Sequence, residues 1–298
     1  MHVSRSHFSL VLPIATALTV GGAASASGLI AYDGFNYPSG PNLYLANGGT
    51  GWSSPWYDIG ALPTGVAPEG LSWSGLPTVG GSAFTAPFAS ADFTRYSRGI
   101  ASYSAPNDTV YLSFLFRPNP GYGLGGGLAF GTWTNGMVVG VHPGTGMYGL
   151  STPPGDASAD TSVPMVQGTT ALVVARVTKN VDATFTWSIY VDPTVGAPEP
   201  AVPGASMVTT LGLPQAVFIY NDGGFSTDEI RVGTTWNSVL GVEAPPCPGD
   251  LDGNTIVDGA DLGMLLGAWG TPDADLNGDG TTDGADLGLL LASWGPCA

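Results

Sequence analysis

The stretch Thr109–Arg117 reads TVYLSFLFR, and every second side chain from Val110 to Phe116 is apolar. This alternation is typical of a half-buried β-strand. A second such run, ATFTWSIYVD, covers 183–192, and turns rich in Pro, Gly and Asn separate further short apolar runs at 127–133, 136–142, 171–178, 215–220 and 229–234. The pattern predicts a mainly β protein, with an antiparallel sandwich or jelly roll over residues 27–242 and no convincing helix there.

The composition of the chain supports an ordered protein. Gly (46) and Pro (25) make up about a quarter of the 298 residues, which is close to the composition of disordered chains. Hydrophobic residues reach 43% and aromatic residues 10%, however, so the chain has enough apolar material for a core. We therefore assign the Gly and Pro to turns between many short strands.

The charge of the chain restricts its partners. There are 23 acidic and 7 basic residues, for a formal net charge of −16. Binding to nucleic acid or to an anionic membrane surface needs clustered Lys and Arg. The balance therefore argues against both, and leaves cations, neutral ligands and other proteins.

Residues 1–26 have the layout of a secretory signal peptide. Arg5 precedes an apolar stretch over 8–20, and small residues end at Ala26, the expected cleavage point. The stretch is too short for a membrane anchor, and Pro13 interrupts it. We expect a secreted protein, extracellular or at the cell surface, with no transmembrane segment after cleavage.

Residues 247–298 form a second region and contain an internal repeat. The copy starting at Asp250 reads DLDGNTIVDGADLGMLLGAWG, and the copy starting at Asp275 reads DLNGDGTTDGADLGLLLASWG. The region carries nine Asp and no Lys or Arg, so it should repel itself unless cations neutralise it. A short linker, 243–248, precedes it and contains three Pro.

Each copy opens with the oxygen-ligand spacing of a twelve-residue EF-hand calcium loop. The expected ligands are Asp250, Asp252, Asn254, Ile256 (backbone carbonyl), Asp258 and Asp261 in loop one, and Asp275, Asn277, Asp279, Thr281 (backbone carbonyl), Asp283 and Asp286 in loop two. Position 6 needs a sharp turn, which Gly280 suits and Thr255 does not. We expect two Ca²⁺ sites, the second tighter; the alternative is a pair of solvated Asp/Gly turns.

A short amphipathic helix is predicted after each loop. Leucines and a tryptophan stand at i, i+3, i+4 and i+7, namely Leu262, Leu265, Leu266 and Trp269, and then Leu287, Leu290, Leu291 and Trp294. Prolines occupy the places where an EF-hand would have its preceding helices. Because neither helix can bury its apolar stripe alone, the two copies should pack against each other.

The two cysteines of the chain, Cys247 and Cys297, bracket this region. In a secreted protein they are expected to form a disulfide that joins the ends of the unit, the alternative being free thiols.

This constellation resembles a dockerin module: two tandem calcium loops, each followed by a helix and lacking the preceding one. The version with CPGDLDG, DGADLG, LLGAWG and a terminal CA is similar to Cys-bracketed dockerins of secreted planctomycete-type bacterial proteins. The resemblance implies docking onto a cohesin-like scaffold or surface protein. Positions 10 and 11 of each loop help set partner choice in that family. Here they are Gly259-Ala260 and Gly284-Ala285, identical in both copies, which would allow docking in two rotated orientations.

The long first module resembles the concanavalin-like, laminin-G-type jelly rolls of secreted bacterial proteins. The phrases that carry the resemblance are LIAYDGFNYPSG, NGGTGWSSPW, GLPTVGGSA, VYLSFLFR, LVVARV and DEIRVGTTWNSV. In that fold the first and last strands lie together, which implies that 32–35 runs beside 229–232.

Catalytic residues are not assigned in the first module. Catalytic glucanases of this fold carry clustered acids on one strand, whereas Glu69, Glu199 and Glu243 are isolated here. The adjacent pair Asp228-Glu229 points to opposite faces of a strand and is interpreted as structural.

A sugar site would need exposed aromatic rings. The best candidates are Trp52, Trp56 and Tyr57 in the segment GTGWSSPWYD, and the alternative is that these rings belong to the core.

Three hypotheses for function follow. The preferred one is a non-catalytic sandwich that binds carbohydrate or another surface component and is anchored through a calcium-dependent dockerin. The second is a divergent glycoside hydrolase that acts in polysaccharide catabolism within a cohesin–dockerin complex. The third is a structural cell-surface protein.

Overall fold

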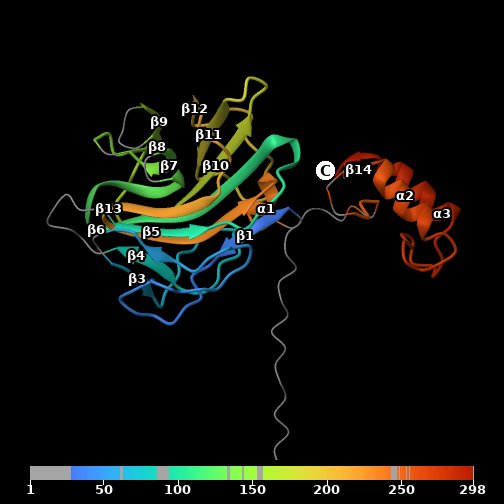
Figure 1. Ribbon diagram of the computed structural model, residues 1–298, viewed down its shortest axis with the longest axis horizontal. Helices are drawn as coiled ribbons and strands as arrows, with labels where there is room; N and C mark the ends of the chain where they lie inside the picture. The colour runs from blue at the N-terminus through green and yellow to red at the C-terminus, as the bar shows by residue number, and fades with distance from the viewer. Residues whose placement is uncertain are drawn as a thin grey trace, which may run out of the picture.

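The computed structural model describes residues 28–60, 63–85, 94–132, 135–142, 144–152, 157–242, 247, 249–252, 254 and 256–297. The predicted signal peptide, 1–26, and most of the predicted linker, 243–248, lie outside the described residues. Figure 1 shows an antiparallel β-sandwich followed by a small helical unit. The mainly β fold class is confirmed, with helices that are few and short. In the described part of the chain, no helix is long and apolar enough to cross a membrane.

Two long strands organise the sandwich. They are β6 (Thr109–Thr132) and β13 (Ala216–Gly233), which pair with each other along most of their length. Paired strands follow the order β12-β11-β10-β6-β13-β4-β3. Strands β7, β8 and β9 pair in succession and join this path at β6. Strands β1 and β5 both pair with β13, and β2 pairs with β5. Register shifts between Asp222 and Gly223 and between Asp228 and Arg231 mark irregularities in β13 that bend a strand.

The remaining strands are short. Their bounds are β1 (Leu29–Asp33), β2 (Tyr57–Asp58), β3 (Thr64–Ala67), β4 (Ser82–Thr85), β5 (Thr94–Gly99), β7 (Asn135–Val141), β8 (Met147–Thr152), β9 (Ala157–Pro164), β10 (Ala171–Lys179), β11 (Phe185–Val191) and β12 (Ala205–Thr209). A 3₁₀ turn, η1 (Pro106–Asp108), precedes β6. The implied pairing of the first and last strands is confirmed, because Tyr32 lies opposite Arg231 and Asp33 opposite Ile230.

Side chains that alternate along β6 separate into two apolar clusters. Val110, Leu112, Phe114 and Phe116 belong to the main core, with Trp187 of β11. Leu115 points the other way, into a second cluster with Leu172, Val174, Tyr190 and Trp236. The period of two seen in the sequence therefore places one set of side chains on each face of the strand.

A four-residue helix, α1 (Trp236–Val239), covers the second cluster and corrects the prediction of no helix in this module. Thr235 caps it, and the side chain of Thr235 accepts a hydrogen bond from the backbone N–H of Ser238. A single turn is too short to show helical periodicity in a sequence, so its signal is the capping residue alone.

Candidate functional site

The C-terminal unit has a core of its own. Helices α2 (Gly259–Gly267) and α3 (Gly284–Ala292) contribute Leu265 and Leu290, which are fully buried with Val257. Two short strands, β14 (Ile256–Val257) and β15 (Gly295–Pro296), pair next to the helices. The predicted disulfide is confirmed: Cys247 and Cys297 are bonded, with their Cα atoms 5.9 Å apart.

The two helices bury only part of their apolar stripes. Leu262 and Leu287 pack partly against the core, as the predicted packing of the two copies requires. Leu266 and Leu291 remain exposed, at 52% and 51% accessible, and Trp269 and Trp294 are similar. The two tryptophans were predicted to lie in the helices, but α2 ends at Gly267 and α3 at Ala292, so each tryptophan follows its helix. The exposed residues stand at equivalent positions of the two copies, so the repeat presents the same apolar side chains twice.

Both helices begin at an aspartate of the preceding loop. Asp258 is the N-cap of α2 and accepts a hydrogen bond from the N–H of Ala260, and Asp283 does the same for α3 with Ala285. The third helical residue completes a capping box in each copy, with Asp261 and Asp286 in that place. The sequence therefore uses the end of each loop to start each helix.

The aspartates at position 12 close the loops on themselves. In loop one the N–H groups of Leu251 and Asp252 donate to Asp261 Oδ1 at 2.7 and 3.1 Å, and that of Asp258 donates to Oδ2 at 2.8 Å. Both position-12 side chains are fully buried. The carboxylate thus ties positions 2, 3 and 9 of the loop to position 12.

Loop two repeats these contacts with its own residues. Asp286 accepts from the N–H groups of Leu276, Asn277 and Asp283 at 2.8, 3.1 and 2.7 Å. The N–H of Asp283, and then those of Asn277 and Leu276, lower the pKa of Asp286. For Asp261 burial acts to raise the pKa, but the backbone bonds outweigh burial and lower the pKa. Both groups therefore stay ionised near neutral pH.

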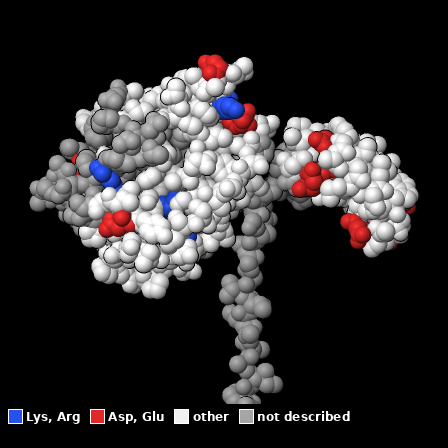
Figure 2. All heavy atoms as spheres, in the orientation of Figure 1, with Lys and Arg blue, Asp and Glu red and all other residues white. Residues whose placement is uncertain are grey.

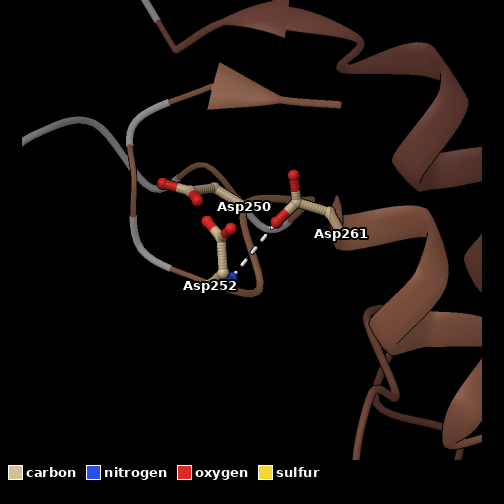
Figure 3. A group of neighbouring side chains, drawn as sticks. All are labelled: Asp250, Asp252 and Asp261. Atoms are coloured by element: carbon tan, nitrogen blue, oxygen red, sulfur yellow. Dashed lines mark hydrogen bonds between the residues drawn. The ribbon is translucent and has the colours of Figure 1, made fainter. Parts of the chain in front are cut away.

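In loop one, three carboxylates converge, as Figure 3 shows. Asp250, Asp252 and Asp261 each offer an oxygen, and these oxygens all lie within 4.8 Å of one another. A purely oxygen donor set of this kind fits a hard cation such as Ca²⁺. The other expected ligands in this loop are Asn254 (exposed), Ile256 and Asp258 (half-buried).

Loop two has Asn277 where loop one has Asp252, so the equivalent positions hold two carboxylates and an amide. Asp275 accepts hydrogen bonds from the N–H groups of Gly278, Asp279 and Gly280. Gly280 has a positive φ of 96°, which is the left-handed conformation expected at position 6 of the loop. The remaining expected ligands, Asn277, Asp279, Thr281 and Asp283, are exposed on the same loop. A second cation site here stays a prediction.

The C-terminal unit carries many aspartates and no Lys or Arg that could balance their charge. Figure 2 shows acidic and no basic side chains on the visible face of the C-terminal unit, as expected for a region without Lys or Arg. The residues at positions 10 and 11, Gly259-Ala260 and Gly284-Ala285, are exposed in both copies. They are placed where a partner could contact the start of either helix.

The aromatic platform expected at Trp52, Trp56 and Tyr57 does not form. Trp56 is fully buried in the core, where its Nε1–H donates to Asp33 Oδ2 at 2.9 Å. Trp52 is half-buried and donates from Nε1 to the carbonyl of Tyr32, and Tyr57 alone of the three is exposed. The prediction is wrong for Trp56 because an apolar ring with a buried acceptor gains more from the core than from water.

A buried ion pair explains why this loop folds inward. Arg98 of β5 pairs with Asp33 of β1, and both side chains are about 1% exposed. The same guanidinium lies over the ring of Trp52, 4.9 Å from its centroid. The pair joins residues 65 apart in sequence, so local sequence patterns carried no signal for it.

The acidic pair Asp228-Glu229 is built into the scaffold. Asp228 Oδ2 accepts the N–H of Leu71 at 2.7 Å, and Glu229 Oε1 accepts the N–H of Val79 at 2.6 Å. Arg231 donates to Glu229 Oε2 at 2.6 Å. Both carboxyl groups are fully buried, which supports the structural interpretation: they hold the segment 71–79 on the sheet.

This cluster should make the stability of the sandwich depend on pH. Burial, and then the charge of Glu229, raise the pKa of Asp228 to about 8. In the unfolded chain an Asp ionises near ~4, so the folded state holds an extra proton between these values. The free energy of unfolding should therefore fall as pH rises from 5 to 8.5. Calorimetric melting at constant calcium measures this slope.

Two variants test whether Asp228 is the group that causes this pH dependence of stability. Asp228→Asn should be less stable overall and show a flatter slope, because no proton is lost there. Asp182→Asn is the matched control, since Asp182 is exposed and its pKa is lowered by hydrogen bonds from the side chain and backbone of Thr184. A wild-type slope in Asp228→Asn would contradict the assignment.

Comparison with known proteins gives no family. No family model matches the chain, and no curated protein matches it. Solved structures resemble it at low identity. A protein of unknown function from Shewanella oneidensis has 8% identity and a TM-score of 0.40, covering 76% of this chain and 95% of its own.

Two other solved structures belong to proteins named for carbohydrates. The endo-β-1,4-glucuronan lyase of the fungus Trichoderma reesei has 12% identity and a TM-score of 0.35, with 65% and 96% of the two chains covered. The carbohydrate recognition domain of Emp46p, in a metal-free form, has 14% identity and a TM-score of 0.35, with 66% and 95% covered. Identities this low carry no inference about activity, so function is argued from the residues of this chain.

Proposed function

We propose that this is a secreted, non-catalytic protein with a carbohydrate- or surface-binding sandwich, anchored by a calcium-dependent dockerin-type unit. The observation that carries the proposal is the duplicated apolar surface formed by α2, α3 and the tryptophan that follows each helix. Leu266 and Trp269, with their twins Leu291 and Trp294, are about half exposed on a unit of some fifty residues. Exposed apolar side chains grouped in this way mark a protein-binding surface.

The apolar surface would be fully ordered only when calcium is bound. Each helix starts at a loop whose last ligand position is also the third residue of the helix. Neutralising the loop carboxylates would therefore fix the starts of both helices and the apolar residues they carry. We infer two Ca²⁺ ions, one per loop, held by the carboxylates and carbonyls at the twelve ligand positions named above.

The sandwich would supply the second contact, with glycan as the preferred ligand. A retaining glycosidase needs two carboxyl groups about 5 Å apart across a sugar. The adjacent pair Asp228-Glu229 is buried and already bonded to backbone N–H groups, so it is not placed to serve a substrate. This favours binding over hydrolysis.

Loop one should bind calcium more weakly than loop two because of position 6. Thr255 lies outside the described residues, but its twin Gly280 has a left-handed backbone. That conformation costs a non-glycine residue about 1–2 kcal/mol. Thr255→Gly should therefore strengthen calcium binding at the weaker site by about fivefold or more. Titration calorimetry measures both sites, and an unchanged tighter site serves as the internal control.

The docking proposal is tested with a panel of purified cohesin modules on a biosensor. We expect the full mature chain to bind one of them in calcium and to dissociate in EGTA. Leu266→Asp and Leu291→Asp should each leave partial binding, because the other copy can dock, and the double variant should lose it. Val181→Asp, at a fully exposed sandwich position, is the control and should bind normally. Binding that ignores both EGTA and the double variant would refute the proposal.

A further inference from the structure

The sandwich carries an open depression that the sequence did not indicate. Its volume is about 630 Å³, and β3, β4, β6 and β13 form it. Phe84, Val66 and Pro68 provide apolar surface, and Arg117, Asn119 and Ser226 provide polar groups. We call this depression the Arg117 groove.

Cross-strand register explains how these side chains come together. Ser226 of β13 lies directly opposite Phe84 of β4 on one side and opposite Arg117 of β6 on the other. Directly paired residues in antiparallel strands share a face of the sheet. Phe84, Ser226 and Arg117 therefore form one row across three strands, and Asn119 follows two residues after Arg117 on the same face.

The ring of Phe84 lies over a glycine of the neighbouring strand. A Cβ atom added at Gly65 would come within 2.5 Å of Cε1 of the Phe84 ring. Gly65 is the direct partner of Phe84 in the pairing of β3 with β4. The missing side chain lets the ring lie close to the sheet, where it lines the groove.

Hydrogen bonds hold the polar side of the groove in order. Arg117 Nε–H donates to Asn119 Oδ1 at 3.2 Å, and Asn119 Nδ2 donates to Ser226 Oγ at 2.9 Å. These bonds use Nε of the guanidinium, and its two terminal nitrogens donate no hydrogen bond to the residues that the structure describes. The arrangement fixes a cation, an amide and a hydroxyl side by side.

Arg117 makes no ion pair with any of the residues that the structure describes. Four other basic residues are ion-paired, namely Arg98, Arg176, Lys179 and Arg231. Arg117 has no acidic partner in the part of the chain that the structure describes, and no acidic residue is among those that line the groove. In a protein with a net charge of −16, a groove whose described lining includes an arginine and no acidic residue is a local exception.

We propose that the Arg117 groove binds an acidic saccharide, specifically a sugar with a carboxylate such as a uronate unit. The guanidinium would pair with the carboxylate, since Arg presents two parallel donors to such a group. Phe84 would pack on the C–H face of the sugar ring, and Asn119 and Ser226 would bond its hydroxyls. An acidic peptide could pair with Arg117, but it lacks the ring hydroxyls that Asn119 and Ser226 would bind. The inference rests on the carbohydrate-binding half of the proposed function and names its ligand and place.

The test compares two ligands that differ only in charge. A short β-1,4-linked glucuronate oligosaccharide is titrated against the full mature chain in calcium, beside its carboxyl-reduced, neutral counterpart. We expect the acidic ligand to bind about tenfold tighter or more. Arg117→Ala should remove this preference, and Phe84→Ala should weaken both ligands alike. Lys179→Ala removes the same charge outside the groove and should keep the preference.

The outcomes separate this inference from the proposed function. Equal binding of both ligands, or a preference that survives Arg117→Ala, overturns the groove assignment and leaves carbohydrate binding standing. A preference lost equally in Lys179→Ala also overturns it, because the effect is then one of net charge. Failure of every glycan on an array to bind overturns this inference and the carbohydrate-binding half of the proposed function. Melting temperatures close to wild type show that the variants are folded.

Discussion

Asp286→Ala is expected to abolish calcium binding by loop two and to weaken the C-terminal unit. The carboxylate is fully buried and accepts three backbone N–H groups from both ends of the loop. Alanine would leave these donors unsatisfied and remove a ligand at the same time. Loss of a group that both ligates and positions a loop should reduce calcium affinity by about 100-fold or more.

Calorimetric titration of the full mature chain measures the effect, with one of two binding events expected to vanish. Asp273→Ala is the matched control, because Asp273 is exposed and precedes the loop. It removes the same charge but should keep both events. Two intact events in Asp286→Ala would mean that loop two is only a turn, and would contradict the calcium proposal for that copy.

Removing the disulfide is the second large change. In Cys247→Ala/Cys297→Ala, the stability of the C-terminal unit should fall by about 4 kcal/mol, because the bond closes a loop with a separation of 50 residues. The core of the unit has few fully buried apolar residues, among them Val257, Leu265 and Leu290, so this is a large fraction of what holds it together.

Calcium should become essential for folding in the disulfide variant. Tryptophan fluorescence of Trp269 and Trp294 on the C-terminal unit, followed in urea with calcium and with EGTA, measures both effects, and the sandwich transition serves as the internal reference. We expect the unit to unfold in EGTA without denaturant in the variant but not in the oxidised wild type. Equal midpoints for the two proteins would show that the disulfide adds nothing to stability.

The repeat was predictable because its chemistry is local. All expected ligands of a loop lie within twelve residues, and spacing alone placed Asp261 and Asp286 at position 12 among the expected ligands. Their burial and their hydrogen bonds to the start of the loop came from the structure. The amphipathic stripes were visible for the same reason. What spacing did not show is that Leu266 and Leu291 stay exposed while Leu265 and Leu290 are buried, since this depends on how the two copies meet.

The sandwich was predictable as a class and less so in detail. Alternation around Val110–Phe116 identified β6, but Pro118 and Pro120 made its continuation read as a separate strand, although the structure has one strand to Thr132. The buried pair Arg98–Asp33 and the row from Phe84 to Arg117 depend on register between distant strands. A single sequence does not contain that register, so the Arg117 groove emerged only from the fold.

The pairing of β1 with β13 also governs the order in which the protein can assemble. Tyr32 hydrogen-bonds Glu229 across 197 residues, so the sandwich is incomplete until nearly its whole length has been synthesised. Closing contacts of such long range fold slowly and late. A nascent chain would therefore leave the ribosome open, in a form suited to threading through a translocation pore. If the protein is exported and binds calcium as proposed, the C-terminal unit would mature last, when the disulfide between Cys247 and Cys297 forms and calcium binds.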